Sequence, residues 1–169
     1  MASAIFGFVG VVLGSITTSV LTVYRERLAT RREQALRDEQ YARVRTSARD
    51  TFQRDSILAL QAATSDLICA AYQELDRVVG EFKQTGTWPA RQWETPTAVG
   101  WSDALLRLEQ ARARVFDDEI RSLAGDVRTT AGDSIWAGSL ATAKEHSRKL
   151  EPLQAQLNSA VTRALPSLY

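Results

Sequence analysis

The residue types that most often carry out chemistry are scarce in this chain. Cys69 is the single cysteine and His146 the single histidine among 169 residues. One cysteine cannot form an intramolecular disulfide or a cysteine-rich zinc site, and one histidine cannot supply a two-histidine metal motif. The sequence therefore predicts no metal site and no bound cofactor.

Nucleophilic and acid–base catalysis are not indicated either. Cys69 lies in an apolar helical segment, where we expect it to pack as a small hydrophobic residue. Asp117, Asp118 and Glu119 form a short acidic run that we interpret as a solvated helix face. The sequence has no glycine-rich phosphate loop, no G-x-S-x-G elbow, no H-E-x-x-H and no C-x-x-C. We therefore expect a protein without enzymatic activity.

Residues 84–101 hold three of the four tryptophans and two prolines. A loop of this length is uncommon unless it is functional or mobile, and Trp and Arg dominate the hot spots of protein interfaces. We therefore predict that Trp88, Arg91 and Trp93 bind an unidentified cytoplasmic protein partner. The alternative is that the tryptophans fold back to plug the end of a helical bundle, as we expect for Trp101.

The N-terminal residues 2–24 are uncharged and mostly apolar. As a helix they would extend about 35 Å, enough to cross a hydrocarbon core of about 30 Å. No Ala-x-Ala cleavage site follows, so we expect a retained transmembrane helix and not a signal peptide. A buried helix of a soluble protein is the alternative, but it fits so long an uncharged terminal run less well.

A collar of arginines follows this segment, at Arg25, Arg27, Arg31 and Arg32. Basic residues next to a span are held on the cytoplasmic side, so the N-terminus should face outward and the remainder should be cytoplasmic. This predicts a single-pass protein of the cell (inner or plasma) membrane. The arginines either also contact anionic headgroups of the lipid bilayer or only set the topology.

Small residues on the predicted span favour association of two copies. Gly10 and Gly14 have the spacing that lets membrane helices approach closely, and Gly7 lies on an overlapping face. We therefore expect a homo-oligomer. The formal net charge is only +1, and acidic residues are mixed with the basic ones, so nucleic acid is not an expected partner.

The rest of the chain predicts an all-α fold. Residues 25–47 are rich in helix formers but poor in large apolar residues, which indicates an arginine-rich helical stalk. Leu28, Ala35 and Ala42 are seven apart, but alanine makes a poor coiled-coil seam. Residues 48–169 form one helical domain, and no segment alternates with the period of a strand.

Apolar residues recur every three or four positions in three stretches, which predicts helices at about 48–83, 102–136 and 139–165. The first should end near Gly86, the second should begin at Ser102 as N-cap, and Pro152 should kink or break the third. The expected buried positions are Phe52, Leu60, Ala63, Leu67, Ala71, Leu75, Val78 and Phe82; then Leu105, Leu108, Val115, Ile120, Leu123 and Val127; then Leu140, Leu150, Leu153, Leu157, Val161, Ala164 and Leu168.

These helices predict an antiparallel three-helix bundle, with the 84–101 loop at one end and the 134–139 turn at the other. Gly125 and Gly132 are seven apart and would lie on one face of the second helix. Either they allow a neighbouring helix to approach closely, with a frayed end near Gly138, or Gly132 ends the helix early.

Two functions fit this organisation. The first is a membrane-anchored helical interaction or scaffold protein without catalysis, with a cytoplasmic bundle that self-associates. The second is a membrane-active envelope protein, such as a phage-type lysis or exclusion factor, that acts through its transmembrane segment.

Overall fold

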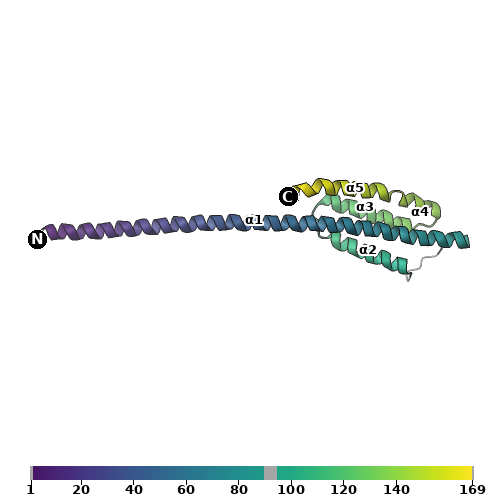
Figure 1. Ribbon diagram of the computed structural model, residues 1–169, viewed down its shortest axis with the longest axis horizontal. Helices are drawn as coiled ribbons and strands as arrows, with labels where there is room; N and C mark the ends of the chain where they lie inside the picture. The colour runs from purple at the N-terminus through teal and green to yellow at the C-terminus, as the bar shows by residue number, and fades with distance from the viewer. Residues whose placement is uncertain (1, 90–94, 169) are drawn as a thin grey trace. The chain divides into compact units, whose positions relative to one another are not determined.

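The computed structural model describes the backbone of residues 2–89 and 95–168, and the side chains of residues 27, 30–89 and 95–168. Within these ranges the chain is helical and contains no strand, which confirms the predicted all-α class (Figure 1). The chain divides into two units, Met1–Ala48 and Arg49–Tyr169.

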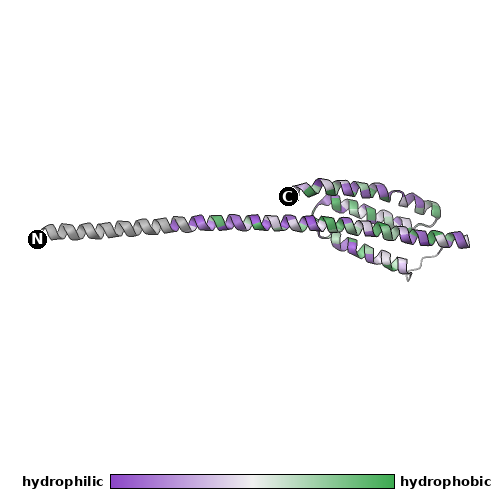
Figure 2. Cartoon of the chain, in the orientation of Figure 1, coloured by the Kyte–Doolittle hydropathy of each residue, from purple (hydrophilic) through white to green (hydrophobic). Residues whose placement is uncertain are grey.

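The N-terminal unit belongs to the first helix, α1, which covers Ala2–Thr85. Every described side chain from Arg27 to Ala48 is exposed. In Figure 2 this stretch is mainly hydrophilic, whereas the part of α1 after residue 48 carries many more hydrophobic positions. A stalk of this kind buries almost nothing by itself.

No helix in the part of the chain with described side chains is both long and apolar enough to cross a membrane. Residues 2–24 are helical, but their side chains lie outside the described residues, as does that of Arg25. The transmembrane span and the association face at Gly7, Gly10 and Gly14 therefore stay predictions.

The second unit is a bundle with four arms, and the prediction of three helices was wrong. The first arm is α1 from Arg49 onward, and each later arm runs antiparallel to the one before it (Figure 1). The later arms are α2 (Pro96–Arg112), α3 (Asp118–Ile135), and α4 (Leu140–Ser147) with α5 (Leu150–Ala164), which ends in the 3-10 turn η1 (Leu165–Leu168).

The predicted helix at 102–136 is two helices joined by a turn at residues 113–117. Asp117 is the N-cap of α3, and its side chain accepts a hydrogen bond of 2.9 Å from the Ile120 N–H. Asp118 and Glu119 fill the first turn, where carboxylates complement the positive end of the helix dipole. The acidic run interpreted as a solvated face thus marks a helix start.

Ser102 was also wrongly predicted as the N-cap of the second helix. That position belongs to Thr95, whose hydroxyl accepts a bond of 3.2 Å from the Ala98 N–H, and Pro96 occupies the first helical position. Ser102 lies inside α2 and donates to the Ala98 carbonyl. The connection is consequently shorter than predicted, residues 86–95, and Trp101 is a buried residue of α2.

Other helix ends follow local signals in the sequence. Gly86 follows α1 with a φ of +68°, a conformation that favours glycine, and its N–H donates to the Phe82 carbonyl. Arg148 and Lys149 separate α4 from α5, and Pro152 lies in the first turn of α5, where a missing N–H costs nothing. Helix α3 continues through Gly132 and ends at Ile135.

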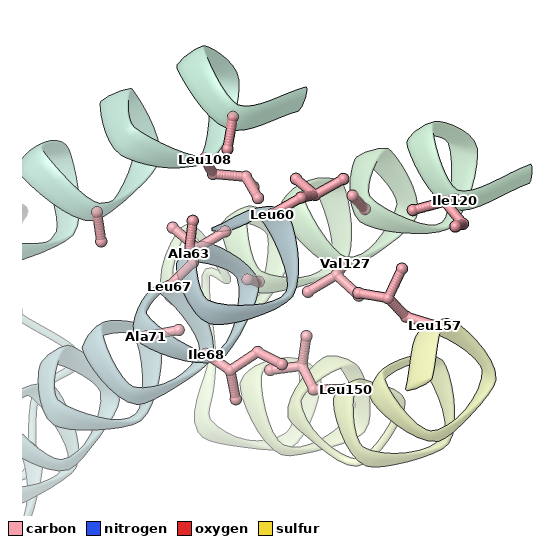
Figure 3. Packing of buried hydrophobic residues seen from close by; sticks show 14 of the residues in the cluster. Leu60, Ala63, Leu67, Ile68, Ala71, Leu108, Ile120, Val127, Leu150 and Leu157 are labelled. Carbon is pink, nitrogen blue, oxygen red and sulfur yellow. The ribbon is translucent and has the colours of Figure 1, made fainter. Parts of the chain in front are cut away.

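The core is one cluster drawn from all four arms, and the labelled side chains of Figure 3 converge on it. Two residues of α1 that were expected to pack inside the bundle are instead exposed. Phe52 is 49% exposed, because it lies where α1 enters the bundle and packs against another exposed ring. Cys69 is also exposed, next to the buried Ile68, so it does not pack in the core as expected. The cluster comprises Ile57, Leu60, Ala63, Leu67, Ile68, Ala70, Ala71, Trp101, Ala104, Leu108, Ala111, Val115, Ile120, Ala124, Val127, Ala131, Leu150, Leu157, Ala160 and Val161.

The connections 86–95 and 136–139 lie at the same end of the bundle, not at opposite ends as predicted. The indole N–H of Trp88 donates to the Ala137 carbonyl across 2.9 Å, which ties the two connections together. The extra hairpin at 113–117 causes the difference, since each added antiparallel helix moves the next connection to the other end.

Candidate interaction surface

Large exposed hydrophobic residues are unevenly distributed over the bundle. In the described part of residues 49–169, α3, α4 and α5 contribute none to this set. All of them belong to α1, α2 or the α2–α3 turn: Phe52, Leu58, Tyr72, Val99, Leu106 and Phe116. They do not share one side: the Tyr72 hydroxyl donates to the Ser147 carbonyl at the end of α4, whereas the Phe52 ring contacts Phe116 after α2.

A groove of about 560 Å³ runs between α1 and α2. Alanines form most of its floor, at positions 59, 62, 63 and 111, and Phe52 lines it as well. Positions 59, 62, 63 and 66 recur every three or four residues, so they fall on one face of α1. Small side chains on that face leave room for a docked element.

The rim of the groove is charged, with a different sign on each helix. Asp55 and Asp66 line the α1 side, and Arg107 and Arg114 line the side of α2 and its following turn. The Nε of Arg107 lies 4.0 Å from the Asp66 carboxylate across the groove. Asp55 also contacts Arg54 at 3.3 Å. These ion pairs are exposed and add little to stability.

One buried side chain positions the turn that closes the groove. Gln53 is 6% exposed; its amide donates to the Arg114 carbonyl at 3.1 Å and accepts from the Phe116 N–H at 2.9 Å. Val115, between these two residues, is fully buried. The turn is therefore fixed on α1 at both sides of a buried anchor residue.

This turn presents the Phe116 ring to solvent. Its centroid lies 6.4 Å from that of Phe52, with the planes tilted by 44°. The guanidinium carbon of Arg49 lies 5.7 Å from the Phe116 centroid, which is within the range of a cation–π contact. Two exposed aromatic rings and a cation thus gather at one end of the groove.

A buried carboxylate holds the N-terminal end of α2 on α1. Glu74 is 8% exposed and pairs with Arg77 through bonds of 2.7 and 3.1 Å, while the Thr97 hydroxyl also donates to it. Burial alone would raise the pKa of Glu74, but hydrogen bonds from Arg77 and Thr97 and the charge of Arg77 outweigh it and lower the pKa. Glu74 is therefore an ionised structural residue at neutral pH.

The residues predicted to bind a partner are only partly described. Trp88 is half-buried, and its ring meets the edge of Phe82 at 5.7 Å between centroids, in addition to its bond to Ala137. This placement matches the alternative in which the tryptophan plugs the bundle end. Arg91 and Trp93 lie outside the described residues.

The arginine collar is described at three of its four positions. Arg27, Arg31 and Arg32 are exposed on α1. Within the residues with described side chains, no three His, Cys, Asp or Glu side chains gather in a way that could hold a metal ion.

Sequence reasoning missed the groove, although part of its signal was present. Phe116 was left unassigned and Phe52 was assigned to the core, whereas both face solvent at the groove. The chain matches no protein-family model, no curated protein and no solved structure to which it has been compared.

Proposed function

We propose that this chain is a single-pass, membrane-anchored interaction or scaffold protein, with its N-terminus outside and its helical bundle in the cytoplasm. Residues 2–24 serve as the anchor, and the arginines from Arg25 onward set the orientation and meet the headgroups of the bilayer. The support for this part is the sequence of residues 2–32: an uncharged apolar run followed directly by a basic collar.

The observation that carries the interaction role is the groove between α1 and α2, whose floor is mostly alanine and beside which the rings of Phe52 and Phe116 are exposed. The groove between α1 and α2, with Phe52 and Phe116 at one end, supplies a surface on which a helix or a second domain gains contact area. Among the described residues of α3, α4 and α5, none is a large exposed hydrophobic residue. The Trp88–Trp93 loop is the second candidate for a partner surface.

Fractionation of cells that express the full chain tests the anchor and its orientation. We expect the protein in the membrane fraction, resistant to alkaline carbonate, with a C-terminal reporter active only in the cytoplasm. The matched control replaces Val11 and Val12 with arginine in the predicted span, which should release the chain from the membrane. A full chain that stays in the soluble fraction contradicts the proposal.

Expression of the predicted span alone separates the interaction role from a membrane-active one. Without residues 45–169 the proposed scaffold has no binding surface, so the truncated chain should leave growth and membrane potential unchanged. Growth arrest or depolarisation by the span alone would instead favour an envelope-active protein and end the scaffold proposal.

A further inference from the structure

The charges around the α1–α2 groove are arranged so that the groove surface complements a second copy of itself. We propose that this groove is the interface of a two-fold dimer of bundles, in which α1 of each copy covers α2 of the other. This deepens the interaction role of the proposed function and rests on it for the biological setting, but its geometry comes from the bundle alone.

The argument starts from the positions of four rim residues. Because α1 and α2 are antiparallel, Asp66 lies opposite Arg107 at one end of the groove. Asp55 and Arg114 line the other end, where Gln53 fixes the turn. Each end therefore has one acid, on the α1 side, and one arginine, on the α2 side.

Two face-to-face arrangements place the groove of one copy on the groove of another. If the two-fold axis runs along the helices, α1 of one copy lies over α2 of its partner, and each acid meets an arginine at both ends. If the axis runs across the helices, α1 lies over α1, Asp55 meets Asp66, and the arginines meet each other. Like charges brought together cost free energy, so the charges select the first arrangement.

The selected arrangement agrees with two other features of the bundle. It places the exposed rings of Phe52 and Phe116 of both copies at the same end, where they cover one another. It also makes the two α1 helices parallel, so that both chains enter their bundles at the same end.

The small side chains of the groove floor allow the close approach that such a dimer needs. Ala59 and Ala62 are exposed although they are apolar, and Gln110 is the one uncharged polar side chain longer than serine that lines the groove with them. A second copy therefore covers the alanines, the two aromatic rings and the rim charges together. No separate partner with its own matching charges is needed.

Two double variants of the full chain test the interface by giving the whole rim one sign of charge. Asp55→Arg/Asp66→Arg makes both ends of the groove basic, and Arg107→Asp/Arg114→Asp makes both ends acidic, so that each variant repels its own copies in either face-to-face arrangement. Both variants also carry Gly10→Leu/Gly14→Leu. The parent to which they are compared carries only these two substitutions, so association through the predicted span is weakened equally in all three proteins. Dissociation constants are measured in detergent micelles by sedimentation, and circular dichroism checks that each variant is folded.

We expect each double variant alone to dimerise at least about ten-fold more weakly than the parent, since every rim contact becomes repulsive. An equimolar mixture of the two should restore a heterodimer, because each basic end then meets an acidic end. Dimers of either variant as tight as the parent, a parent that stays monomeric, or a mixture that fails to recover would each overturn the proposal. Cell fractionation tests the membrane anchor independently of dimerisation. A failure of the anchor proposal can therefore be told apart from a failure of the dimer proposal.

Discussion

The backbone N–H of Phe116 donates to the side-chain oxygen of Gln53 across 2.9 Å, although the two residues are 63 positions apart. The same side chain donates to the Arg114 carbonyl, so one amide satisfies both polar groups that flank the buried Val115. The α2–α3 turn thus depends on α1 for its hydrogen bonds.

Replacing Gln53 with alanine should destabilise the bundle by about 1–3 kcal/mol, because two backbone groups lose their partner beside a buried residue. The measurement is the free energy of unfolding from urea titration of the full chain. Gln61→Ala is the matched control: Gln61 pairs with Asn158 at an exposed site, and its loss should cost less than about 0.5 kcal/mol. Equal losses for both variants would show that the turn does not depend on Gln53.

Glu74 should make the bundle sensitive to acid. Its pKa is lowered in the folded state, so its contribution is fully present above the ordinary glutamate pKa and is lost as the pH falls through the lower, folded value. Glu74→Gln should therefore lower stability at neutral pH, by about 1–2 kcal/mol, and flatten the loss of stability in acid. Unfolding free energies measured from neutral pH into the acid range test this.

Glu145 is the control for that titration. The pKa of Glu145 is also lowered, chiefly by its hydrogen bond with Lys149, but this pair is exposed. High salt should therefore remove the effect of Glu145→Gln while leaving most of the effect of Glu74→Gln. If salt abolishes both effects, the Glu74 site is more open to solvent than its burial indicates.

Trp88 should contribute to stability through its N–H as well as its ring. Trp88→Phe keeps the contact with Phe82 and loses the bond to the Ala137 carbonyl, at a cost of about 1 kcal/mol, and Trp88→Ala should cost more. Thermal unfolding of the two variants measures the difference.

The same residue distinguishes a structural role from a binding role. If the loop binds a partner, Trp88→Ala/Trp93→Ala should capture less of it from a lysate, while Trp88→Phe stays near the parent. Undiminished capture of every partner by the double alanine variant would remove the loop as a binding site and leave Trp88 as a plug.

The helix boundaries can be tested through their caps. Asp117→Ala should cost about 1 kcal/mol because the Ile120 N–H loses its acceptor at the start of α3. Ser102→Ala should change stability by less than about 0.5 kcal/mol, since that hydroxyl only bonds within α2. The opposite ranking would support a single helix that starts at Ser102.

Helical periodicity revealed the all-α class and most of the core, but not the number of arms. Leu108 and Val115 keep helical spacing across the α2–α3 turn, and the turn contains neither glycine nor proline, so the pattern looks continuous. The group that stabilises the break, Gln53, is distant in sequence and has no local signal. The cap at Asp117 was the available clue, and it resembled an ordinary charged helix face.

The candidate surface was even less accessible to sequence reasoning. The groove is formed by outward faces of α1 and α2; Phe52 follows the helical spacing of core residues, and Phe116, in the turn beside it, carries no local signal of its own. Only the relative placement of the helices shows that Phe52 and Phe116 face solvent. In contrast, Gly86 and Ser139 act at helix ends through local backbone geometry, and the sequence predicted both positions.

The even number of arms has a practical consequence for engineering. The chain's C-terminal end lies at the end of the bundle where α1 enters, whereas three arms would have carried it to the far end (Figure 1). A short peptide could therefore join the two positions, and the connection 86–95 could be opened to create new termini. Such a circular permutant would free α1 from everything that precedes the bundle while keeping all four arms.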